Sequence, residues 1–105
     1  MGNLDFKALK KRSKAIRESY HKLEEEHHET QWSIEEDALA FLTDAGLIGR
    51  NVMSQQERWP KTNSQEELEH KLGECIWWLS ILADRSGIDI EEATEKFLSK
   101  TEELF

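Results

Sequence analysis

The chain has little of what builds disulfide frameworks, β-sheets or membrane spans. Its 105 residues include one proline, one cysteine and five glycines. The lone Cys75 cannot form an intramolecular disulfide, and its place inside an apolar run predicts a buried structural thiol. No alternating stretch rich in Val and Ile suggests a strand. The longest apolar run, Cys75 to Ala83, is too short to cross a bilayer.

Cations are also scarce: the chain has 14 Lys and Arg residues against 22 Asp and Glu residues, and its formal net charge is −8. This balance argues against a nucleic-acid backbone as the main partner. The first residues are charged and lack an apolar core segment, so we expect no signal peptide and no membrane partner. Length and composition therefore predict one cytoplasmic domain over residues 1–105.

The start and stop signals of the sequence predict four helices. Helix-start signals with capping-box spacing occur three times, and Gly87 is the expected C′ residue after the third helix. Pro60 ends the helix before it. The start signals are Ser33 with Glu36, Ser64 with Glu67, and Asp89 with Glu92. The pattern predicts an all-α fold with helices over residues 4–28, 34–53, 65–86 and 90–104.

The third of these helices is the most apolar. One face carries Leu68, Leu72, Ile76, Leu79 and Ala83, and a second apolar surface holds Trp77, Trp78 and Ile81. A helix that is apolar nearly all round must be covered on all sides. A chain with 37% apolar and 34% charged residues has few partners to offer. We therefore expect a homodimer or higher homo-oligomer, with the Trp77–Trp78–Ile81 surface at the subunit contact.

Residues 68–103 read LEHKLGECIWWLSILADRSGIDIEEATEKFLSKTEE. An acidic residue precedes an aromatic and aliphatic run, the helix stops at Gly87, and another starts at Asp89. This order resembles the second half of the MazG-like nucleotide pyrophosphohydrolases, an all-α family. The resemblance extends over about residues 32–105, because registers, caps and spacing agree in both halves, and Trp32, just before Ser33, also matches a tryptophan common in that family.

The resemblance implies a metal site on two facing helices, one with E-x-x-E and the other with E-x-x-D. In the family these four carboxylates hold Mg²⁺ while a nucleoside triphosphate is hydrolysed to the monophosphate and pyrophosphate. Here LTDAGLIG, aligned through Gly46, gives Asp44 and Leu47, and KLGE, aligned through Gly73, gives Lys71 and Glu74. Asp44 and Glu74 are thus the catalytic and metal-ligating candidates, with Asp84 as a third ligand. Leu47 and Lys71 are degenerate positions.

Other residues are candidates for substrate binding. Arg50, Arg58 and Lys61 flank the long connection and could hold a triphosphate, although solvated loop cations have the same pattern. Trp32 could stack on a base, or pack in the core or at a subunit contact.

Two functions remain open at this point. One is a Mg²⁺-dependent pyrophosphohydrolase, and the other is a catalytically inactive dimeric module that binds a nucleotide or a protein. The residues at Leu47 and Lys71 favour the inactive module, because a lysine works against a dication. We further expect Lys71 to face Asp44 and to pair with Asp44 and Glu74 in place of the metal.

Overall fold

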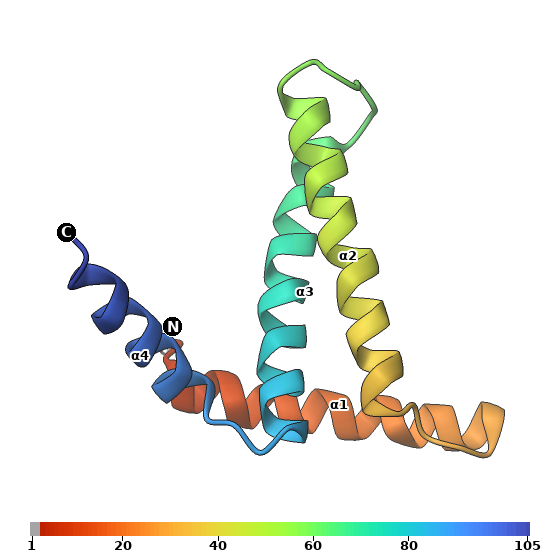
Figure 1. The fold of residues 1–105 in the computed structure, drawn as a ribbon. Helices are drawn as coiled ribbons and strands as arrows, with labels where there is room; N and C mark the ends of the chain where they lie inside the picture. Colours follow the sequence, from red (N-terminus) through yellow and green to blue (C-terminus); the bar gives the residue numbers. More distant parts are fainter. Residues whose placement is uncertain (1–2) are drawn as a thin grey trace. The chain divides into compact units, whose positions relative to one another are not determined.

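The computed structural model describes residues 3–105 and is all-α over that range, with no strand (Figure 1). Its helices are α1 (Phe6–His28), α2 (Ile34–Gln55), α3 (Ser64–Arg85) and α4 (Ile90–Glu102). The fold class and the four helices predicted from the sequence are confirmed, and each boundary lies close to its predicted position. Within the described residues, no helix is long and apolar enough to cross a membrane.

Helix ends follow from local chemistry at three of the predicted signals. Ser33 accepts from the Glu36 amide while the Glu36 carboxylate accepts from the Ser33 amide, which completes a capping box at α2. Asp89 accepts from the amides of Glu91 and Glu92 at the start of α4. Gly87, at φ +70°, ends α3, because glycine adopts this left-handed conformation without strain.

The predicted cap at Ser64 is wrong. Ser64 is the first residue of α3 rather than the residue before it, and Asn63, at φ 57°, precedes it. The Ser64 hydroxyl accepts from the Gln55 side chain at 2.7 Å. Glu67, which was to complete the cap, pairs instead with Lys61. A charged partner from the connecting loop thus replaces the local capping interaction.

The chain divides into two compact units. One, the hairpin unit, is Trp32–Leu79, and the other, the terminal unit, combines Met1–Gln31 with Ser80–Phe105. Helix α3 belongs to the hairpin unit up to Leu79 and to the terminal unit from Ser80. The single domain expected from chain length stays a prediction.

In the hairpin unit, α2 and the first part of α3 lie side by side and run in opposite directions (Figure 1). Residues seven apart repeat along both inner faces: Asp44 and Asn51 on α2, and Glu67 and Glu74 on α3. Seven residues are close to two helical turns, so each series lies on one face of its helix. The antiparallel register places Asp44 level with Glu74, and Asn51 level with Glu67.

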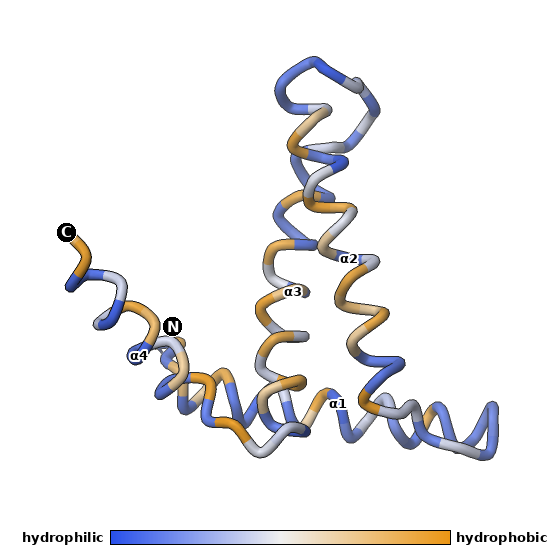
Figure 2. The backbone as a smooth tube through the Cα atoms, in the orientation of Figure 1, coloured by the Kyte–Doolittle hydropathy of each residue, from blue (hydrophilic) through white to orange (hydrophobic). Residues whose placement is uncertain are grey.

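The inner faces of the helices are more polar than their apolar stripes predict. Large side chains on α3 such as Leu72, Ile76 and Leu79 are 44–53% exposed, while Cys75, Trp78 and Ile81 are buried. The subunit contact expected at the Trp77–Trp78–Ile81 surface is thus contradicted for Trp78 and Ile81, because this chain itself buries both side chains. Figure 2 shows apolar residues recurring along α3 beyond its hydrophilic first turn, which is why composition alone does not select the buried face.

The terminal unit holds α1, the end of α3 and α4. Lys10 Nζ lies 3.1 Å from Asp89 Oδ2 and so links α1 to the first turn of α4. The buried residues of α1 are Ser13 and Arg17, and Arg17 Nη1 donates to Glu24 at 2.8 Å. Ser13 and Arg17 are four residues apart and so lie on one face of α1, and this buried face is polar.

Candidate functional site

A lysine joins two carboxylates in the middle of the hairpin unit. Lys71 Nζ on α3 donates to Asp44 Oδ1 on α2 at 3.0 Å and to Glu74 Oε1, one turn further along α3, at 2.9 Å. The expectation that Lys71 pairs with both acids is confirmed. Asp44 and Glu74, the two candidate ligands, are therefore brought to one place, with an ammonium group between them. We call these three residues the lysine bridge.

Trp78 also binds the lysine bridge, through Asp44. Trp78 Nε1 donates to the second carboxylate oxygen of Asp44, Oδ2, at 2.9 Å. Asp44 thus receives a donor on each oxygen, which fixes the orientation of the carboxylate. Its side chain is 14% exposed, and that of Lys71 is 18% exposed, so the pair is partly shielded from water. Removing one partner of such a pair costs more than at an open surface, because the remaining charge is left shielded and unpaired.

The charges of the lysine bridge stabilise one another. Hydrogen bonds to Glu74 and then to Asp44 raise the pKa of Lys71 well above its ordinary value of 10.5. Close by, burial and then the negative charge of Asp44 raise the pKa of the Cys75 thiol. Cys75 is thus a buried, protonated thiol, as the sequence predicts. Lys71 remains an ammonium at every physiological pH.

The residues at this place do not fit a multi-carboxylate Mg²⁺ site. Mg²⁺ needs oxygen ligands in near-octahedral geometry, and the carboxylate oxygens that face each other here both bind Lys71 Nζ. Leu47 has no carboxylate, and its backbone carbonyl accepts from Asn51 Nδ2 at 2.8 Å. Over residues 3–105, no three His, Cys, Asp or Glu side chains form a group that could hold a metal ion. With Leu47 and Lys71 in place of two carboxylates, the site binds an ammonium group where the family's four acids would hold Mg²⁺.

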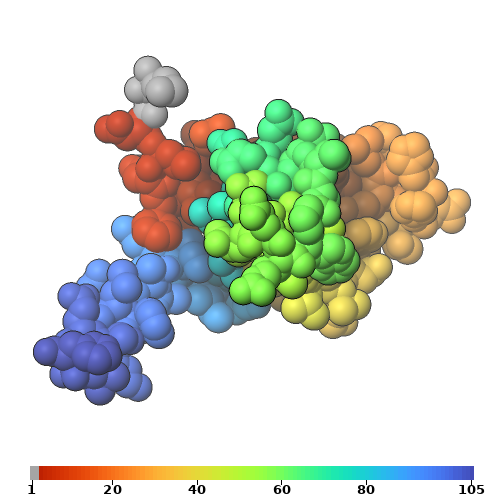
Figure 3. Space-filling view, turned by 90° about the horizontal axis from the view of Figure 1, so that it is seen from above, coloured from red at the N-terminus to blue at the C-terminus, as the bar shows by residue number. Residues whose placement is uncertain are grey.

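A second lysine acts in the same way at the closed end of the hairpin. Lys61 Nζ donates to Asn51 Oδ1 at 3.1 Å and also to the Glu67 carboxylate. The Lys61 amide donates to Ser54 Oγ at 3.0 Å, which fastens the loop to α2. Lys61, and then the Asn51 amide, lower the pKa of Glu67. Figure 3 looks onto this end of the hairpin, where the loop atoms are green.

Arg50, Arg58 and Trp32 are the other residues predicted to bind a substrate. The Arg50 guanidinium lies 3.7 Å from the centre of the Trp59 ring, and Arg50 Nη1 donates to the Trp59 carbonyl at 2.6 Å. The side chain of Arg58 is exposed, and Trp32 is 38% exposed. Of the three cations, Arg50 and Lys61 thus have partners within the hairpin unit. Their role in binding a triphosphate stays a prediction.

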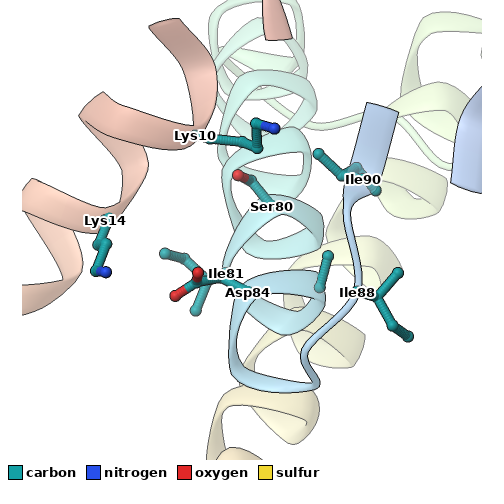
Figure 4. Close-up of a pocket in the computed structure, with 8 residues that line it drawn as sticks. Lys10, Lys14, Ser80, Ile81, Asp84, Ile88 and Ile90 are labelled. Atoms are coloured by element: carbon teal, nitrogen blue, oxygen red, sulfur yellow. The ribbon is translucent and has the colours of Figure 1, made fainter. Parts of the chain in front are cut away.

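Asp84, the third candidate ligand, belongs to the terminal unit, where it lines a small pocket. The pocket has a volume of about 40 Å³, with Lys10 and Lys14 from α1 on one side and Ile88 and Ile90 on the other (Figure 4). A space of this size holds one or two water molecules rather than a nucleotide.

Sequence reasoning missed two parts of this arrangement. Trp78 was assigned to a subunit contact, although its indole N–H serves Asp44. The Lys61, Asn51 and Glu67 cluster was not foreseen. The available signal was the seven-residue spacing of the polar residues on both helices, which indicates polar layers inside a helical hairpin.

Comparisons with protein-family models, with curated proteins and with solved structures each return no match for this chain. The class that the fold defines is therefore an all-α protein with a lysine-bridged helical hairpin. The MazG-like resemblance rests on the residues described above.

Proposed function

We propose that this chain is a catalytically inactive, MazG-like dimeric module that binds a nucleotide or a protein and does not hydrolyse nucleotides. The observation that carries the proposal is the lysine bridge. Lys71 Nζ sits within hydrogen-bond distance of Asp44 and Glu74, the two acids that the resemblance retains. The ammonium group supplies one positive charge there and hydrogen-bonds the carboxylate oxygens that a dication would need as ligands.

Dimerisation in this proposal is supported by the distribution of apolar side chains. Many large ones are exposed on every helix, among them Leu39, Leu42, Ile76 and Phe97. Among the described residues, the buried apolar ones are few: Cys75, Trp78, Ile81 and Ala83. Contiguous apolar surface beyond a few hundred Å² is rare on monomers and marks interaction sites. A partner subunit is the simplest cover for a chain with so small a core.

A second function is kept because Asp44 and Glu74 do come together across the two helices. This is the Mg²⁺-dependent pyrophosphohydrolase, in which a nucleoside triphosphate and Mg²⁺ would together displace Lys71 from the carboxylates. The pyrophosphohydrolase needs Asp44 and Glu74 free of Lys71, whereas the inactive module does not. An experiment that removes both acids therefore separates the two functions.

Pyrophosphate release from a panel of ribonucleoside and deoxyribonucleoside triphosphates, with Mg²⁺ or Mn²⁺, is the test. The proposal predicts no release above that of Asp44→Asn/Glu74→Gln, which removes both acids and keeps their shapes. Release that is lost in this double variant would establish the pyrophosphohydrolase and reject the inactive module. Calorimetry with the same nucleotides reports whether any of them binds without turnover.

A further inference from the structure

Two pairs of polar residues frame the small pocket of the terminal unit. Ser80 and Asp84, one turn apart, lie on α3, and Lys10 and Lys14, also one turn apart, lie on α1 (Figure 4). Apolar side chains, among them Ile81, line the rest of the space. All of these residues belong to one compact unit, apart from the lysine bridge. We call this space the α1–α3 pocket.

Ser80 is the buried polar residue of the α1–α3 pocket. It is only 3% exposed, yet its hydroxyl makes no hydrogen bond to any residue that the structure describes. In the same part of the chain, every fully covered side-chain nitrogen or oxygen has a partner. The Ser80 hydroxyl must therefore open onto space that a small molecule can reach, and the α1–α3 pocket is that space.

Lys14 and Asp84 line the same space without pairing directly. Over residues 3–105, neither side chain makes a hydrogen bond or a salt bridge. Lys10, by contrast, is already paired with Asp89. Opposite charges that border one polar space but lie too far apart for a direct bond are joined by water when a molecule fits between them. The α1–α3 pocket thus offers a hydroxyl, an ammonium and a carboxylate to one small ligand.

The charges around the pocket favour a neutral ligand. Lys10 is balanced by Asp89, whose carboxylate lies 3.1 Å away, and Lys14 shares the pocket with Asp84, which has the opposite sign. An anion would be repelled by Asp84, and a cation would be repelled by Lys14. A neutral molecule that both donates and accepts hydrogen bonds suits these groups, because it can donate to the carboxylate and accept from the ammonium.

The size of the pocket narrows the ligand to water. Its volume of about 40 Å³ is enough for roughly one or two water molecules. Cavities lined only by apolar groups stay dry, whereas a polar cavity with two to four hydrogen-bonding partners holds water. Ser80, Lys14 and Asp84 supply about three partners, which is the usual number for a buried water.

We propose that the α1–α3 pocket is a binding site for bridging water, which links Ser80 and Asp84 of α3 to Lys14 of α1. The bridge attaches α1 to the end of α3 through polar contacts, alongside the Lys10–Asp89 pair that attaches α1 to the first turn of α4. The apolar part of the wall slows exchange of this water with the solvent. The inference concerns the terminal unit and does not rest on the proposed function.

The first test is the sign of an alanine effect. Ser80→Ala should lower the melting temperature, because the water loses a partner and links Lys14 to α3 less well. A pocket without bound water predicts a higher melting temperature, since alanine has the higher helix propensity and the substitution removes a buried hydroxyl that has no partner. A melting temperature that rises or stays the same would therefore reject the bridge.

Ser19→Ala is the matched control for helix propensity. Ser19 is exposed on α1, and its hydroxyl donates to the Ala15 carbonyl of the same helix at 3.2 Å. Its replacement should not lower the melting temperature, because a bond of this kind does not stabilise a helix. A fall as large as that of Ser80→Ala would mean that the loss in Ser80→Ala does not come from the pocket.

The second test counts the water itself. Magnetic relaxation dispersion of the water oxygen nuclei should show at least one long-lived water in the wild type that is missing from Ser80→Val, whose larger apolar side chain occupies the pocket. The same number of long-lived waters in both proteins would contradict the proposal.

If Ser80→Val does not fold, a thermodynamic cycle of Ser80→Ala with Lys14→Met decides instead. Two residues that share a water are coupled, so the double variant should lose less stability than the sum of the two single losses. Ser80→Ala with Lys7→Met is the control and should be additive, because Lys7 is exposed on α1 and does not line the pocket. Additivity in both cycles would reject the bridge.

Discussion

Trp78 and Lys71 share the carboxylate of Asp44: the indole Nε1 donates to Oδ2 at 2.9 Å and the ammonium Nζ donates to Oδ1 at 3.0 Å. One donor is neutral and comes from a buried side chain, while the other is charged and also serves Glu74. Asp44 is thus satisfied from two positions of α3. Because both donors come from α3, this carboxylate fixes how α2 lies against it.

Loss of the ammonium should cost stability. Lys71→Met removes the partner of two carboxylates that lie close together, and we expect the free energy of unfolding to fall by about 1–3 kcal/mol at neutral pH. Urea denaturation in metal-free buffer measures the change. Lys96→Met, on the exposed part of α4, is the control and should be nearly neutral. Equal stability of both variants would mean that the lysine bridge contributes nothing.

The stabilisation from Lys71 should persist to high pH. A raised pKa in the folded state means that its contribution is complete below the ordinary value of 10.5 and is lost only as pH rises through the higher folded value. The stability difference between the wild type and Lys71→Met should therefore stay constant from pH 7 to pH 10. Denaturation curves at several pH values test this, and a difference that shrinks below pH 9 would contradict it.

The Lys61 cluster should respond to acid instead. Because Lys61 and Asn51 lower the pKa of Glu67, its contribution is present above the ordinary carboxylate value of 4.5 and is lost as pH falls through the lower folded value. Glu67→Gln should thus be less stable than the wild type at pH 7, and the two should converge under acid. Melting temperatures across pH 2–7 report the convergence. Parallel profiles for the two proteins would show that Glu67 is not linked to folding.

Local features were predictable from the sequence, whereas the buried faces were not. The caps at Ser33 and Asp89 and the stop at Gly87 depend on residues within one turn, so their spacing identifies them. The pairing of Lys71 with Asp44 was predictable only by aligning two motifs 27 residues apart. Periodicity did not distinguish Leu72 from Trp78 as the buried residue of α3, because both lie on apolar stripes and the choice depends on the partner helix.

Glu67 shows the same limit for a single residue. Its spacing from Ser64 suits a capping box, but the loop brings Lys61 to it, and a charged donor outcompetes a backbone amide. The sequence could predict that Glu67 lies in the first turn of a helix but not which donor it binds.

Thermal unfolding with and without Mg²⁺, in the wild type and in Leu47→Glu/Lys71→Glu, tests the central claim most directly. The double variant restores four acids at the positions that the resemblance gives to the metal set. We predict that it is less stable than the wild type in metal-free buffer, because like charges repel, and that millimolar Mg²⁺ raises its melting temperature by linkage to binding. The wild type should not respond to Mg²⁺, since Lys71 holds the carboxylates. A wild type stabilised by Mg²⁺, or a double variant that ignores it, would contradict the replacement of the metal by Lys71.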